Sequence, residues 1–160
     1  MKALAVALAV VGAFLVQTLG GRYFWPIQSY LDLFLLTAAG FGLMEDRQIG
    51  MFAGTAAGLV QDVFSGAPLG LNGVSKTTIG YLAGIAGHRL VVRGWVGRFL
   101  FLAAATASDR IILAAIGQVA DQPPVVGSVP ELLYLCVGNG LVGALVLGMF
   151  DRSTGDPMSQ

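Results

Sequence analysis

The sequence predicts an all-α integral membrane protein: a bundle of six transmembrane helices that forms a single domain over residues 1–160. Two features of composition and one of pattern lead to this class. Apolar residues make up 56% of the chain and charged residues only 11%, whereas about a quarter of the residues in soluble globular proteins are charged. The mean hydropathy is +0.77. The apolar residues are also gathered into six uninterrupted runs, which a soluble domain of this size has no interior to hide.

The six runs predict the positions of the helices. They span residues 3–19, 27–44, 49–64, 72–88, 98–119 and 129–150. At 1.5 Å per residue such runs give helices of about 24 to 33 Å, close to the roughly 30 Å hydrocarbon core of a bilayer. The third and fourth runs are the shortest, and we expect a thinned or partly re-entrant passage there. The connections are too short to bury a core, so we expect the function to lie within the bilayer or at its faces.

The basic residues of the ends and connections predict the orientation of the bundle. Only Arg22 falls on one side of the predicted membrane, and six fall on the other: Lys2, Arg47, Arg89, Arg93, Arg98 and Arg152. By the positive-inside rule, both termini face the cytoplasm. The first run, with Lys2 before it and small residues at 18–21 after it, also resembles a cleavable signal peptide. Its length favours an uncleaved first helix, which also keeps the two termini on the same side.

Several classes of function are disfavoured by residue counts. The formal net charge is zero and no basic cluster occurs, which argues against nucleic-acid binding. A single Cys excludes a disulfide framework, and neither a second Cys nor a His lies in register with it to hold a metal. The single His provides no Ser/His/Asp or Cys/His set. We therefore expect no enzyme, no metal and no cofactor.

Small residues recur at helical spacing in three of the runs. Residues four apart lie on nearly the same side of a helix, so each set forms a stripe that another backbone can approach closely. We favour packing inside the monomer, with a docking face for a partner helix as the alternative. The stripes are Gly50, Gly54 and Gly58 in the third run, Gly80 and Gly84 in the fourth, and Ala3, Ala5, Ala7, Ala9 and Ala13 in the first.

Two ionisable residues lie near the outer ends of neighbouring runs. Asp62 is close to the end of the third run, and Lys76 comes four residues into the fourth. A charge at membrane depth costs from about 2.5 kcal/mol upward, so we expect the two to pair across the hairpin. The uncharged connection between them contains Gly66, Pro68 and Gly70. We expect it to fold back into the outer face of the membrane, with Ser65 or Asn72 capping the next helix.

Asp109 and Arg110 lie near the middle of the fifth run. Neighbouring residues point about 100° apart on a helix, so each of these two needs partners on other helices. Asp32, early in the second run, supplies a further acid. For Asp32, Asp62, Lys76, Asp109 and Arg110 the simplest interpretation is a structural polar network. A ligand pocket, a proton path and a bond to a partner subunit remain open.

The segment 58–84 resembles the core of the MreD family of rod-shape-determining membrane proteins. The resemblance is carried by Gly58-x-x-x-Asp62, by Pro68-Leu-Gly70 in the connection, and by Gly80-Tyr-Leu82 in the next helix. The length, the six runs and the inward termini extend a weaker likeness across the chain. Lys76 and the Asp109-Arg110 pair are not defining positions of that family.

The resemblance implies a non-enzymatic component of the bacterial inner membrane. MreD-like proteins belong to the cell-elongation complex, which maintains rod shape and lateral peptidoglycan synthesis. The expected partner is the membrane helix of MreC, with MreB, RodA and a class B penicillin-binding protein acting indirectly. The surrounding lipid bilayer is the other expected contact.

Two other functions remain open. The MreD family is similar in architecture to the S subunits of energy-coupling-factor vitamin transporters, which contact their partner through alanine stripes in the first helix. The alanines at 3–13 fit that role as well, so a substrate-binding S subunit is the alternative. A proton-coupled transporter that uses Asp109 is a third class.

Overall fold

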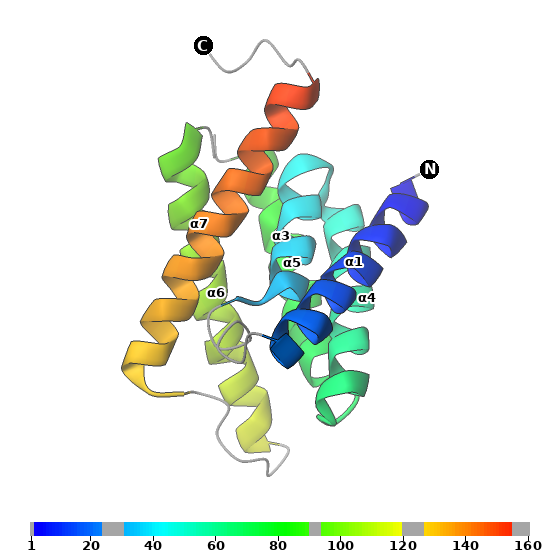
Figure 1. Ribbon diagram of the computed structural model, residues 1–160, viewed down its shortest axis with the longest axis vertical. Helices are drawn as coiled ribbons and strands as arrows, with labels where there is room; N and C mark the ends of the chain where they lie inside the picture. Colours follow the sequence, from blue (N-terminus) through cyan, green and yellow to red (C-terminus); the bar gives the residue numbers. More distant parts are fainter. Residues whose placement is uncertain (1, 24–30, 90–93, 120–126, 155–160) are drawn as a thin grey trace.

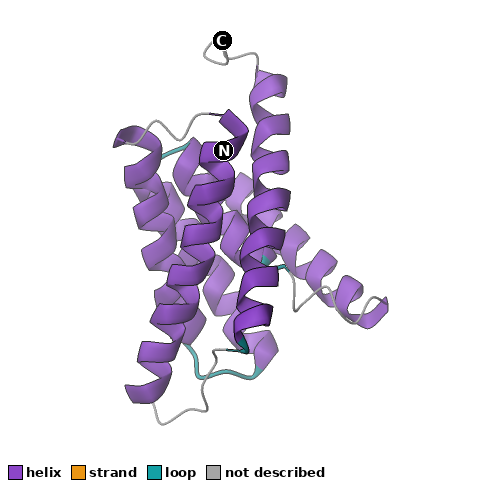
Figure 2. Ribbon diagram, turned by 90° about the vertical axis from the view of Figure 1, so that its left-hand side faces the viewer, coloured by secondary structure: helices purple, strands orange, loops and turns teal. Residues whose placement is uncertain are grey.

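The computed structural model describes residues 2–23, 31–89, 94–119 and 127–154, and every regular element in these ranges is an α-helix. The all-α class is therefore confirmed for the described part of the chain (Figure 2), in which α3 and α4, and α4 and α5, are joined by short connections. The first turn of α1 and the last turn of α7 lie at one end of the bundle, and the turn between α4 and α5 lies at the other (Figure 1). The helices are α1 (Lys2–Tyr23), α3 (Leu33–Met44), α4 (Arg47–Ser65), α5 (Leu71–Arg89), α6 (Gly94–Val119) and α7 (Val129–Thr154).

Three of these helices are long and apolar enough to cross a membrane. They are α1 over Lys2–Gly20, α6 over its whole length and α7 over Val129–Phe150. The helix α3 is apolar but has only 12 residues. The helices α4 and α5 have 19 residues each, but polar residues keep them out of this class. By length and composition, the described residues thus contain three candidate membrane spans, and the six expected spans are not confirmed.

The second helix begins later than the sequence predicts. Residues 31 and 32 are not helical, and α3 starts at Leu33; residues 27–30 of the predicted run lie outside the described part. Asp32 is the N-cap, because its Oδ1 accepts a hydrogen bond from the Leu35 backbone N–H at 3.0 Å. An Asp in this position satisfies an amide that has no partner within the helix. The apolar run therefore included residues that do not belong to the helix.

The helix α1 packs obliquely on α3 and α4 (Figure 1). It buries Val6, Val10 and Ala13, which follow helical spacing, in a cluster with Phe34 of α3 and Ala53 of α4. The side of α1 opposite this cluster is exposed and carries Leu4, Leu8 and Leu15. Ala3, Ala5 and Ala7 are exposed as well. A second cluster joins α3, α5, α6 and α7 through residues that include Leu35, Ile79, Leu102 and Leu147.

The helices α4 and α5 approach so closely that their backbones touch. A Cβ added at Gly54 would fall on the carbonyl group of Lys76, and one at Gly58 would lie 2.5 Å from the Asn72 carbonyl oxygen. Gly50 and Gly80 face each other, and Gly84 lies against the backbone of Arg47. All five glycines of the predicted stripes are thus covered by a helix of the same chain. Glycine is required here because any side chain would separate the two backbones.

Candidate functional site: a buried cluster of four charges

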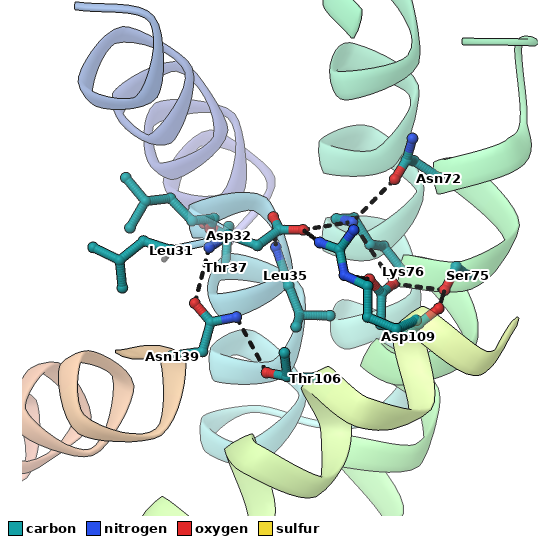
Figure 3. Close-up of polar contacts among 12 residues, drawn as sticks. Leu31, Asp32, Leu35, Thr37, Asn72, Ser75, Lys76, Thr106, Asp109 and Asn139 are labelled. Carbon is teal, nitrogen blue, oxygen red and sulfur yellow. Dashed lines mark hydrogen bonds and ion pairs between the residues drawn. The ribbon is translucent and has the colours of Figure 1, made fainter. Parts of the chain in front are cut away.

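Four charged side chains from three parts of the chain meet inside the bundle (Figure 3). We call Asp32, Lys76, Asp109 and Arg110 the charged tetrad. Asp32 precedes α3, Lys76 belongs to α5, and Asp109 and Arg110 belong to α6. The side chains of Lys76 and Asp109 have no exposed area, that of Asp32 is 2% exposed, and that of Arg110 is 21% exposed. Charged groups this deeply buried are found where partners compensate them.

Lys76 occupies the centre of the tetrad. Its Nζ lies 3.1 Å from Asp32 Oδ2 and 3.7 Å from Asp109 Oδ1. Nζ also donates a hydrogen bond to Asn72 Oδ1 at 3.3 Å. One ammonium group therefore links the start of α3 to the middle of α6.

Asp32 accepts from more groups than any other member of the tetrad. Besides Lys76, Arg110 Nη2 lies 3.4 Å from its Oδ2, and the cap bond from Leu35 N–H ends on its Oδ1. Its position at the N-terminus of α3 adds the favourable end of the helix dipole. Both oxygens of this carboxylate are thus satisfied.

Asp109 is less evenly held. Its Oδ1 accepts a hydrogen bond from Ser75 Oγ at 2.6 Å. Its Oδ2 is buried and has no hydrogen-bond partner, and the nearest cation atom is Arg110 Nε at 3.9 Å, which also lacks a partner. The tetrad therefore contains two polar atoms with unused hydrogen-bonding capacity.

The tetrad balances two cations against two anions. In the interior such an arrangement is tolerated only when every charge has a counterpart, because removing one partner leaves the other buried and unpaired. Both members of the Asp109-Arg110 pair find partners outside α6, namely Lys76 and Ser75 for Asp109 and Asp32 for Arg110. The electrostatic effect is to join α6 to α5 and α3.

The predicted pairing of Asp62 with Lys76 is wrong. Asp62 is buried, but its carboxylate accepts hydrogen bonds from the backbone N–H groups of Gly70, Asn72 and Gly73 at 2.8 to 3.2 Å. Its Oδ1 also accepts from Asn72 Nδ2 at 2.9 Å. The free amides at the start of α5 lie nearer to Asp62 than the lysine does, and they compete successfully for the carboxylate. Asn72 joins the two residues indirectly, since its Oδ1 accepts from Lys76.

The connection between α4 and α5 also differs from its expected capping. Asp62, at the end of α4, supplies the cap of α5 in place of Ser65 or Asn72. Gly66 and Gly70 have φ angles of 67° and 98°, a region that favours glycine. Pro68 accepts a hydrogen bond from the Leu71 N–H at 3.1 Å. The predicted loop motif is thus a tight turn held by the carboxylate of Asp62.

A second polar chain connects α7 to the same region. Asn139 is fully buried; its Oδ1 accepts from the Asp32 backbone N–H at 2.9 Å, and its Nδ2 donates to Thr106 Oγ1 at 3.1 Å (Figure 3). Asn139 therefore forms hydrogen bonds from α7 both to α6 and to the residue before α3. Ser75 and Thr106 were not anticipated. Their only signal was their position in the same helices as Lys76 and Asp109.

No group of three or more His, Cys, Asp or Glu residues suited to a metal ion occurs in the described ranges. Comparison of the chain with protein-family profiles, curated proteins and solved structures gives no match. The functional argument therefore rests on the residues and on the geometry of the tetrad.

Proposed function

We propose that the protein is a non-enzymatic scaffold of the bacterial inner membrane, in the cell-elongation complex that maintains rod shape and lateral peptidoglycan synthesis. In this role all six helices lie in the bilayer and both termini face the cytoplasm. The observation that carries the proposal is the closure of the charged tetrad within the chain. Its charges join three segments of the bundle to one another, an arrangement suited to holding a shape. The resemblance of residues 58–84 to the MreD family supplies the biological setting.

The exposed side of α1 is the proposed docking face for the membrane helix of MreC. The glycines of α4 and α5 are covered within the chain, so they offer no surface to a partner. On α1, by contrast, Ala3 and Ala7 are exposed, and each is followed by an exposed leucine: Leu4 is 64% and Leu8 65% exposed. Small residues flanked by large apolar ones permit close approach of another helix in lipid. MreB, RodA and the penicillin-binding protein would be reached through MreC.

Mild-detergent affinity purification of the tagged protein at native expression level tests this proposal. Mass spectrometry should recover MreC and the wall synthases. Ala7→Leu should lower the yield of MreC, because the larger side chain prevents the partner helix from approaching α1 closely. Ala104→Leu is the matched control, since Ala104 is exposed on α6, and its yield should not change. Equal yields of MreC from both variants would show that α1 is not part of the interface.

A vitamin-transporter S subunit remains the second candidate function. The observation in its favour is the unused hydrogen-bonding capacity of Asp109 Oδ2 and Arg110 Nε, which a polar ligand would satisfy. The same purification distinguishes the two roles. A bound vitamin together with an ATPase-linked membrane partner would support the S subunit and contradict the scaffold.

A further inference from the structure

The two oxygens of the buried Asp109 carboxylate have unequal surroundings. Oδ1 accepts from Ser75 Oγ at 2.6 Å and lies 3.7 Å from Lys76 Nζ. Oδ2 is buried and has no hydrogen-bond partner. A carboxylate oxygen buried without a donor carries a cost of lost hydration that no hydrogen bond offsets; the nearest cation atom, Arg110 Nε, is 3.9 Å away. A proton on Oδ2 removes the charge that causes this cost.

The other buried acid of the tetrad is held in the opposite way. Asp32 lies 3.1 Å from Lys76 and 3.4 Å from Arg110, and it caps α3 through Leu35. These contacts favour its ionised form, and the N-terminal end of the helix dipole favours it further. Asp109 lies in the middle of α6, where no helix end contributes. Of the two acids, Asp109 is the one with an oxygen that accepts no hydrogen bond.

All charged and titratable groups near Asp109 can be named within the described residues. From α3 it faces Asp32, from α5 Lys76 with the Ser75 hydroxyl, and on its own helix Arg110. On α7, Cys136 lies within range of the Arg110 charge. Asp62 of α4 is separated from Lys76 by Asn72. The two cations stabilise the carboxylate form of Asp109, whereas burial and the charge of Asp32 oppose it.

We propose that Asp109 is a proton-binding site inside the bundle, beside the partly exposed side chain of Arg110. Because burial and the neighbouring cations act in opposite directions, neither form of Asp109 is stabilised by its whole environment. Binding forms one O–H bond at Oδ2, with the proton taken from water, and release returns it. The tetrad changes from neutral to a single positive charge. This inference does not depend on the proposed scaffold role.

Proton binding would alter the contact between α5 and α6. With Asp109 neutral, Lys76 keeps its ion pair with Asp32, and the electrostatic contact from α5 to α6 is reduced to the hydrogen bond with Ser75. The pair formed by Arg110 and Asp32 is retained. The site thus couples a proton to the strength of a helix–helix contact.

Infrared difference spectroscopy of the full-length protein in lipid nanodiscs tests the proposal. The protein is labelled with carbon-13 at the aspartate carboxyl groups, and the pH is lowered from neutral to mildly acidic. Wild type should show a label-shifted C=O band of a buried carboxylic acid that moves further in heavy water. Asp109→Asn should lack this band. Asp109→Glu should restore it at the unlabelled frequency, because the new carboxyl carries no label.

Two further variants separate Asp109 from its neighbours. Asp32→Asn removes the competing anion, so both cations act on Asp109 and its band should require a lower pH. Asp46→Asn, at the N-cap of α4, should leave the band unchanged. Absence of a label-shifted acid band in wild type, or its persistence in Asp109→Asn, would overturn the proposal. If Asp109→Asn does not fold, the comparison of wild type with Asp109→Glu decides the question.

Discussion

The helix α5 is joined to α4 and to α6 in different ways. Towards α4 it presents Gly80 and Gly84, and the two backbones meet with no side chain between them. Towards α6 it presents Ser75 and Lys76, which reach Asp109 through polar contacts. The contact with α4 requires glycines, which have no side chain, whereas the contact with α6 requires charged and polar side chains. The same helix is therefore sensitive to added volume on one face and to lost charge on the other.

The largest expected effect is that of Lys76→Met. Removing the lysine leaves Asp109 buried without its main cation and Asp32 with only Arg110, and breaking a buried ion pair from one side costs about 3–5 kcal/mol. The free energy of unfolding, measured by denaturant titration in detergent, should fall by this amount. Exposed ion pairs contribute up to about 1 kcal/mol. A fall in the free energy of unfolding below this value would show that water reaches the tetrad.

The double variant Lys76→Met with Asp109→Leu provides the control for this prediction. It removes one cation and one anion together and leaves Asp32 paired with Arg110. Replacing a whole buried pair by apolar residues is often nearly neutral, so most of the lost stability should return. A double variant as unstable as Lys76→Met would contradict the assigned pairing.

The second effect tests the glycine contact. Gly54→Ala places a methyl group against the Lys76 carbonyl, and the helices must separate, at a cost of about 1–3 kcal/mol or more. Gly12→Ala is the matched control, because a Cβ on Gly12 of α1 meets nothing within 4 Å. That control should be neutral or stabilising by up to about 1 kcal/mol, because alanine is the better helix former. Equal effects of the two changes would show that α4 and α5 do not touch.

The third effect concerns the turn between the two helices. Asp62→Ala removes the acceptor of three backbone amides, and loss of a helix cap costs about 0.5–2 kcal/mol. If the proposed scaffold role is correct, the yield of the complex with MreC should fall as well. Asp62→Asn retains one acceptor oxygen and should lie between wild type and Asp62→Ala. Unchanged stability, yield and cell shape would exclude a role for the Asp62 cap.

The smallest effect is that of Asn139→Leu. This change removes the hydrogen bonds to the Asp32 backbone and to Thr106. Interhelical hydrogen bonds in membrane proteins contribute about 0.6 kcal/mol on average, so the loss should be well below that of Lys76→Met. Thermal unfolding of the purified variants measures the difference. A loss equal to that of Lys76→Met would show that α7 depends on the tetrad more than its contacts indicate.

Sequence periodicity predicted the helices better than it predicted their contacts. The runs at 49–64, 72–88 and 129–150 correspond closely to α4, α5 and α7. An uninterrupted apolar run marks a segment that is removed from water, and such segments form helices here. Spacing of four likewise placed the glycines on single faces. The start of α3 was missed, because Leu31 and Asp32 were counted into the apolar run, although Asp32 is the N-cap that precedes the helix.

The partners of the buried charges could not be predicted from the sequence, for a different reason. Asp62 and Lys76 are close in sequence and opposite in charge, so pairing them was the simplest hypothesis. The pattern does not show that the amides of Gly70, Asn72 and Gly73 compete for the same carboxylate. Nor does it show that α3 begins beside Lys76. Such choices depend on distances between helices, which are set by packing and not by spacing along the chain.

The order of the tetrad along the chain has a consequence for biosynthesis. Asp32 precedes Lys76, whereas Asp109 and Arg110 follow it. Chains fold from the N-terminus as they emerge from the ribosome, so Lys76 enters its helix before α6 has been made. Asp32 is the only acid of the tetrad then present to neutralise it. The ion pair between Lys76 and Asp32 compensates the lysine charge until Asp109 has been synthesised. We therefore expect the contact between Lys76 and Asp32, 3.1 Å in the complete bundle, to form before α6 is made, and a chain without Asp32 to carry an uncompensated lysine through that interval.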